Sequence, residues 1–93
     1  LHAALAAGTP VDVSVSGLPA DSLGARRAGA LAFEVARRHV ERVVLVSDAQ
    51  IRDAQRALWR ELRVVAEPGG ATALAALASG AYRPAAGERV GVL

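Results

Sequence analysis

The segment Arg42–Asp48, with the sequence RVVLVSD, constrains the fold of this chain more than any other. Its apolar run Val43–Val46 is short and unbroken, as expected for a β-strand that is covered on both faces. Ser47 follows as a candidate N-cap, and Gln50 stands three residues later, in the position of a capping box. A buried strand that passes straight into a helix predicts an α/β fold.

The flanking sequence continues this alternation of strands and helices. Val11–Ser16 alternates apolar and polar residues strictly, which predicts a strand with one dry face. The closing run Glu88–Leu93 predicts a further strand. Helices are expected over Leu1–Ala7 with Gly8 as a left-handed cap, from a start between Asp21 and Ala25 to about His39, from Ser47 to about Leu62, and over Ala71–Ser79 with Gly80 at its end.

The resulting order, α-β-α-β-α-α-β, predicts the fold class α/β, with a short parallel or mostly parallel sheet flanked by helices. Residues 1–93 are expected to form a single α/β fragment, because Leu1 lies in a helix already under way and Leu93 in a strand without a terminator. Independent folding is doubtful, because the apolar content is mostly alanine, which buries little area.

One helix carries the clearest prediction of a core. Helical spacing predicts a buried stripe of Ile51, Ala54, Leu58 and Leu62. Trp59, the single tryptophan, is expected in the core between this helix and the sheet.

Composition excludes several classes of site. Cysteine is absent, so the chain has no disulfide, thiolate nucleophile or Cys-ligated zinc. A net charge of +2 without interleaved aromatic residues argues against a nucleic-acid partner. His2 and His39 fall on different expected helices with no second ligand at metal spacing, so no metal site is expected.

No apolar run approaches the ~20 residues that span a bilayer, and no basic leader is present. A cytoplasmic setting without a membrane partner is the expectation.

The turn Glu67-Pro68-Gly69-Gly70 precedes the alanine-rich helix and is a candidate site. Two glycines before a helix leave free N–H groups that could hold an anion, and Glu67 could accept a hydrogen bond or orient a cationic group. The alternative is that Pro68 and the glycines only form the turn into the helix.

The block ADSLGARR, from Ala20 to Arg27, is a second candidate with two interpretations. Asp21 or Ser22 would serve well as a helix cap, followed by a solvated first turn. The same residues could instead form a loop that faces a ligand.

These two blocks, VAEPGGATALAAL and ADSLGARR, together with the closing GERVGVL, resemble the C-terminal third of the threonine/serine dehydratase family. The members of this family are pyridoxal-phosphate-dependent lyases of fold type II, similar in fold to the β-subunit of tryptophan synthase. The likeness runs from about Val11 to Leu93. It implies a fragment of a three-layer α/β/α large domain that binds the cofactor.

The resemblance also implies roles for the two candidate sites. Glu67, Gly69 and Gly70 would line the cofactor cleft, where the glycines allow close backbone approach, and Asp21 and Ser22 would lie near the ring. Many relatives carry glycine in the place of Ser22, so the role of its hydroxyl is left open. The parent enzyme would deaminate L-threonine or L-serine to a 2-oxo acid and ammonia, although racemases of the family share these blocks.

One departure from the family chemistry stands out. The cofactor's aldehyde must condense with a lysine amine that later moves the substrate's α-proton, and all eleven basic residues of this chain are arginines. No catalytic residue is therefore expected within residues 1–93, which by themselves are expected to be inactive and to bind pyridoxal phosphate weakly or not at all. The rival hypothesis is a non-catalytic α/β association module, whose exposed strand edges would pair with the rest of an enzyme or with a second copy of the chain.

Overall fold

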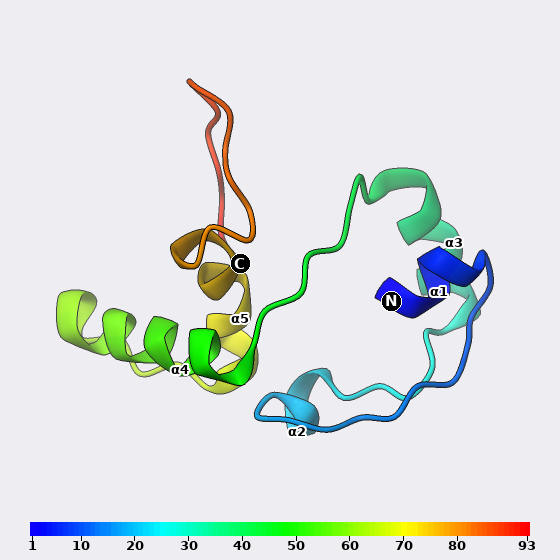
Figure 1. Cartoon of the computed structure of the whole chain (residues 1–93), viewed down its shortest axis with the longest axis horizontal. Coiled ribbons are helices and arrows are strands. Elements are labelled where there is room, and N and C mark those ends of the chain that lie inside the picture. Colours follow the sequence, from blue (N-terminus) through cyan, green and yellow to red (C-terminus); the bar gives the residue numbers. More distant parts are fainter.

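The computed structural model describes residues 1–93 and is built from helices and extended segments (Figure 1). The helices are α1 (His2–Ala7), α2 (Ala20–Leu23), α3 (Ala30–His39), α4 (Asp48–Ala57), the π-helical turn η1 (Leu58–Leu62) and α5 (Pro68–Ala78). No helix has the length and apolarity that a bilayer-crossing segment requires.

The helices form two groups. In one, α4 packs against α5 around a fully buried cluster of Ile51, Ala54, Ala71 and Ala75. In the other, α1 contacts α3, and Ala4, Phe33 and Ala36 are buried. The extended segment between α3 and α4 connects the two groups, as Figure 1 shows, and the loop that carries α2, between α1 and α3, brings α2 into contact with α5.

The expected parallel sheet is not confirmed, because no β-strand forms among residues 1–93. Residues 11–16, 42–46 and 88–93 run without helical structure, yet none pairs with another in a ladder. Alternation is nevertheless present in residues 11–16, where the valines are half-buried and Asp12, Ser14 and Ser16 are exposed. A strand requires a ladder of hydrogen bonds to a neighbour as well as the right pattern, and residues 11–16 have only the single bond from Val13 N–H to the carbonyl of Arg26.

Local signals at helix ends are confirmed. Gly8 ends α1 with φ 70°, and its N–H donates to the carbonyl of Leu5 at 3.3 Å. Ser47 and Gln50 form the complete capping box of α4, with Gln50 N–H donating to Ser47 Oγ at 3.3 Å and Ser47 N–H donating to Gln50 Oε1 at 2.7 Å.

Two helix predictions are wrong in their bounds. The helix expected between Asp21 and His39 is split into α2 and α3, because residues 24–29 leave the helical path and the carbonyl of Arg26 accepts a hydrogen bond from Val13 N–H at 2.8 Å. The last helix begins at Pro68, earlier than the expected Ala71, because proline fits the first helical position.

The predicted stripe holds for Ile51 and Ala54, and Leu58 packs half-buried against their cluster, but the stripe fails at Leu62. Trp59 is 55% exposed and Leu62 is 66% exposed, so neither belongs to the core. The chain passes into the π-helical turn at Leu58, and its wider winding rotates the following side chains away from the stripe. Trp59 instead faces the guanidinium of Arg63, which lies 5.8 Å from the ring centroid.

The fold is open. Only seven of its residues are buried, and its surface of 6794 Å² exceeds the ~5,000 Å² expected for a compact monomer of this mass. Its radius of gyration of 14.3 Å likewise exceeds the ~12 Å of a compact chain of this length. The uncovered area includes apolar side chains on the extended segments, among them Leu45, Val65, Val90 and Val92.

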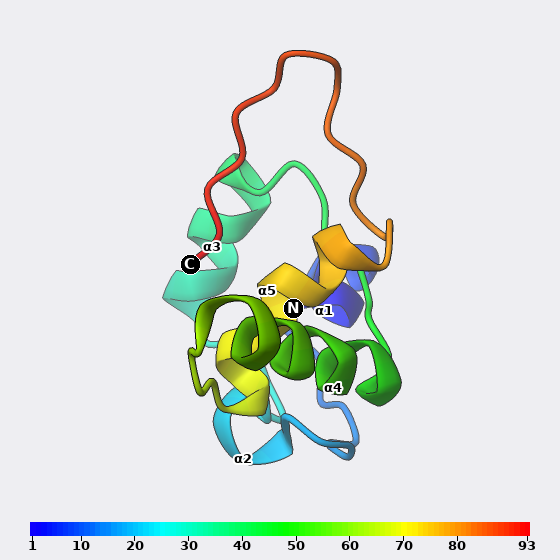
Figure 2. The ribbon, with the colours of Figure 1, turned by 90° about the vertical axis from the view of Figure 1, so that its left-hand side faces the viewer.

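A polar cluster closes the loop after α5, which projects from the body in Figure 2. The Tyr82 hydroxyl donates to Glu88 Oε1, Ala85 N–H donates to Glu88 Oε2 at 2.7 Å, and the Arg42 guanidinium lies 4.8 Å from the Tyr82 ring centroid. The hydrogen bond to Glu88 raises the pKa of Tyr82. The bond from Tyr82, with that from Ala85, lowers the pKa of Glu88.

These shifts give a pH window for the cluster. The Tyr82–Glu88 bond is complete between the ordinary carboxyl and phenol pKa values; it is lost as the pH falls through the lowered pKa of Glu88 or rises through the raised pKa of Tyr82. We expect Glu88→Gln to lower the pKa of Tyr82, the single tyrosine, as measured by ultraviolet absorbance. The control Glu61→Gln, in an exposed pair with Arg60, should leave it unchanged; equal titration of all three proteins would contradict the cluster.

Candidate functional site

The first turn of α5 carries three of the candidate site residues. Glu67 is the N-cap residue, with extended dihedral angles of φ −67° and ψ 164°, and Pro68 occupies the first helical position. The Glu67 side chain is exposed and does not cap the helix. Its carboxylate therefore stays available to a ligand beside Gly69 and Gly70.

The backbone just before Glu67 is fixed by α4. Gln55 Nε2 donates to the carbonyl of Ala66 at 2.8 Å, and both groups are partly buried. Ala66 also packs against the cluster around Ile51. These contacts hold the residue before Glu67 against α4 and so help to fix where Glu67 lies.

The second block reaches the same place. Ser22, in α2, lies against Gly69, in α5, and Figure 2 shows α2 next to the start of that helix. A Cβ added at Gly69 would stand 3.1 Å from Ser22 Cβ, nearer still to Ser22 Oγ, and 3.4 Å from Glu67 Oε1. Asp21 and Ser22 are exposed within one helical turn. The structure thus brings together two blocks that lie far apart in the sequence.

The two glycines of the turn are not equivalent. At Gly69 an added side chain would crowd Ser22, which would have to shift, because its Oγ and Cβ lie in that space. At Gly70 the nearest atoms to an added Cβ, from Ala66 and Glu67, are 3.9 Å away, which is ordinary contact. A side chain is therefore disfavoured at position 69 but not at position 70.

Sequence reasoning missed Asp48 and Gln55, which hold the two loops. In the sequence Asp48 stands out only as one of the acids that interrupt the arginines. Its Oδ1 accepts a hydrogen bond from Leu18 N–H at 3.0 Å, a partly buried contact that anchors the loop leading into α2. The one available signal was position, since Asp48 directly follows the N-cap Ser47 at the end of the apolar run.

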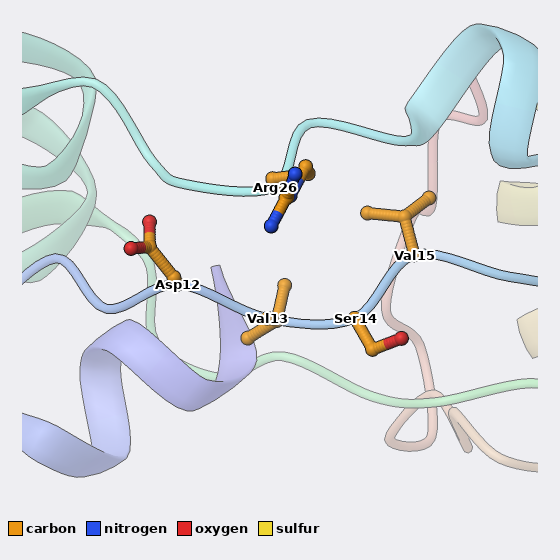
Figure 3. A pocket seen from close by; sticks show the side chains of 5 residues that line it. All are labelled: Asp12, Val13, Ser14, Val15 and Arg26. Atoms are coloured by element: carbon orange, nitrogen blue, oxygen red, sulfur yellow. The ribbon is translucent and has the colours of Figure 1, made fainter.

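The candidate residues line no enclosed cavity. The largest hollow, about 480 Å³, is bounded by Asp12, Val13, Ser14, Val15 and Arg26 (Figure 3). It opens where residues 11–16 have the Arg26 loop along one side only, and the Ser14 side chain points away from Arg26. None of the candidate residues lines this hollow, and Glu67 and Ser22 lie exposed on an open surface.

The Ser22–Gly69 contact predicts how substitutions at the two glycines change the free energy of unfolding. We expect Gly69→Ala to lower the free energy of unfolding by about 1–3 kcal/mol through overpacking. The matched change Gly70→Ala should be neutral or stabilising by up to about 1 kcal/mol. Urea denaturation followed by circular dichroism measures both, and Ser22→Gly should restore the Gly69→Ala protein. Equal effects at the two glycines would show that the contact is not formed.

Comparisons with known proteins agree on one family. The model of the family described as "Pyridoxal-phosphate dependent enzyme" matches residues 1–93. Phenylserine dehydratase of Ralstonia pickettii is 42% identical over all of this chain, which covers 28% of that relative.

Solved structures give the same result. A threonine deaminase from the organism abbreviated T.th. superposes with a TM-score of 0.77 at 28% identity, over 83% of this chain and 26% of that one. Maize serine racemase superposes with a TM-score of 0.73 at 36% identity, over 81% of this chain and 23% of that one. The chain thus spans about a quarter of the length of these relatives. It belongs to the family of pyridoxal-phosphate-dependent enzymes and is similar to its dehydratases and racemases of hydroxy amino acids.

Proposed function

We propose that the complete protein carrying residues 1–93 is a pyridoxal-phosphate-dependent ammonia-lyase that converts L-threonine or L-serine into a 2-oxo acid and ammonia. The observation that carries the proposal is the contact of the Asp21–Ser22 turn with Glu67-Pro68-Gly69-Gly70, in a chain of this family. The names of two relatives, a phenylserine dehydratase and a threonine deaminase, support a β-hydroxy amino acid as the substrate.

The residues present fit one side of a cofactor site. Gly70 has open space beside its backbone, so a flat ring could approach closely there, whereas the corresponding space at Gly69 is filled by Ser22. Glu67 offers an unused carboxylate and Ser22 a hydroxyl, both exposed. Glu67, Gly69, Gly70, Asp21 and Ser22 would form the rim of the site.

The division of roles follows from the chemistry of these groups. Pyridoxal phosphate, when bound, supplies the electron sink for the negative charge that develops at the substrate's α-carbon. Glu67 would accept a hydrogen bond from, or orient, a cationic group on the cofactor or substrate. With no lysine in the chain, the amine that condenses with the aldehyde would come from outside residues 1–93, which would form part of the large domain.

Two other functions have a specific observation behind them. The likeness to maize serine racemase supports inversion of serine as a second reaction at the same site. The excess of exposed surface supports the rival hypothesis of a non-catalytic association module. Product analysis separates the three.

We expect the complete gene product to bind pyridoxal phosphate, with visible absorbance of the bound cofactor, and to release a 2-oxo acid from L-threonine or L-serine. The 93-residue chain alone should show neither property, because it lacks a lysine. D-serine in place of 2-oxo acid would identify a racemase. A complete protein without cofactor and without product would support the association module, and a stable cofactor band on the isolated chain would contradict the need for an outside amine.

Glu67 gives a more local test in the complete protein. We expect Glu67→Gln, which keeps the shape but removes the charge, to lower kcat/KM at least about tenfold, the value of one charge-assisted hydrogen bond. Steady-state kinetics of 2-oxo acid release measures the effect. Glu61→Gln removes a charge from an exposed pair with Arg60 and should leave kcat/KM unchanged; equal kinetics for both variants would remove Glu67 from the site.

A further inference from the structure

The position of α2 raises a question that its own length cannot answer. It has four residues, none of them buried, and so short a helix is not stable by itself. Yet its Ser22 lies so close to Gly69 that a side chain added at Gly69 would force Ser22 to shift. Something outside α2 must fix it against α5.

The fixed point is the carboxylate of Asp48, at the start of α4. Asp48 Oδ1 accepts the Leu18 N–H at 3.0 Å. Gly17, the residue before Leu18, has φ 95°, and a Cβ added there would stand 2.9 Å from Asp48 Oδ1. The turn therefore lies directly on the carboxylate, which a glycine at this dihedral angle permits.

The side chain of Leu18 makes a second, apolar contact that holds the same loop. Its side chain packs against the buried cluster of Ile51, Ala54, Ala71 and Ala75 that joins α4 to α5. The backbone of Leu18 is thus held by Asp48 while its side chain is held by the core. Both contacts place the loop relative to the helix whose first turn carries Glu67.

Only Pro19 separates Leu18 from α2, which begins at Ala20. Ala20 N–H donates to the carbonyl of Gly17 at 3.2 Å, and Leu23 N–H donates to that of Pro19 at 2.8 Å, so the helix grows directly from the tethered turn. A displacement of Leu18 would move Ser22 with it. Few residues lie between the hydrogen bond to Asp48 and the Ser22–Gly69 contact, and backbone hydrogen bonds hold them in a turn and a helix.

We propose that Asp48 is a positioning residue for the candidate cofactor site: its carboxylate oxygen fixes Leu18, and thereby holds Asp21 and Ser22 at the rim beside Gly69. The inference rests on the proposed function. We assign the positioning of Leu18 to the hydrogen bond and not to the negative charge of Asp48. That charge has a separate effect, because an acid in the first turn of α4 stabilises the helix through its dipole. Asparagine keeps the acceptor oxygen and removes the charge, so it separates these two roles.

The test uses the complete protein loaded with pyridoxal phosphate. We expect Asp48→Ala to raise KM for the amino acid, or the dissociation constant of the cofactor, about tenfold, as for one partly buried hydrogen bond left unmade, with a smaller change in kcat and an altered spectrum of bound cofactor. Asp48→Asn should stay within about twofold of the unchanged protein, and Gly17→Ala should reproduce the Asp48→Ala effect by crowding the same oxygen.

Two controls separate positioning from stability. Asp53→Ala removes an exposed acid of the same helix, paired with Arg56 at the surface, and should change neither KM nor the spectrum. Ser47→Ala breaks the capping box, so it should lower the melting temperature but leave KM unchanged. Asp48→Ala behaving like Asp53→Ala, or Asp48→Asn as impaired as Asp48→Ala, would overturn the inference.

Hydrogen exchange gives a readout that needs neither activity nor a folded variant. In the complete protein the Leu18 amide should exchange more slowly than the amide of its neighbour Gly17, which donates no hydrogen bond in the structure. Equal exchange at the two amides would overturn the proposed hydrogen bond to Asp48. A complete protein that protects Leu18 but binds no pyridoxal phosphate would instead refute the proposed function, so the two failures are distinguishable.

Discussion

The packing of α4 against α5 is the interaction on which the rest of this structure depends. Ile51 and Ala54 from one helix meet Ala71 and Ala75 from the other, and all four are buried. Small side chains let the two helix axes approach closely, which compensates for the scarcity of large residues. The contacts of Leu18 and Ala66 with this cluster show that both loops of the candidate site are attached to it. The site is therefore an extension of one small core.

Polar contacts divide into two kinds. Most ion pairs are local and exposed, such as Glu34 with Arg37 and Asp53 with Arg56, and pairs of this kind contribute little to stability. The partly buried hydrogen bonds that cross long stretches of sequence are fewer and more consequential. Asp48 holds the loop before α2, and Gln55 holds the residue before Glu67. One helix, α4, thus positions both motif blocks, although it carries no candidate site residue itself.

Features that depend on neighbouring residues could be predicted from the sequence. The capping box of Ser47 and Gln50, the left-handed Gly8 and the alternation in residues 11–16 all arise from local geometry. Features that depend on a distant partner could not. The strand patterns formed no sheet, because a pattern specifies which face is apolar but supplies no neighbour to bond with. Leu62 left the predicted stripe, and Trp59 the predicted core, because a π-helical turn changed the helical winding that the spacing assumed.

The candidate site also combines features that the sequence predicts with features that only the tertiary structure shows. By itself the sequence determined the chemical groups and their family: a carboxylate before two glycines, an Asp-Ser turn, and no lysine. Only the tertiary structure decided that Ser22 and Gly69 touch, that a side chain would crowd Ser22 at position 69 but not at position 70, and that Asp48 accepts a hydrogen bond from Leu18 N–H. The reason is that side-chain identity and local backbone preference are encoded residue by residue, whereas contacts between distant segments follow from how a shared core brings them together.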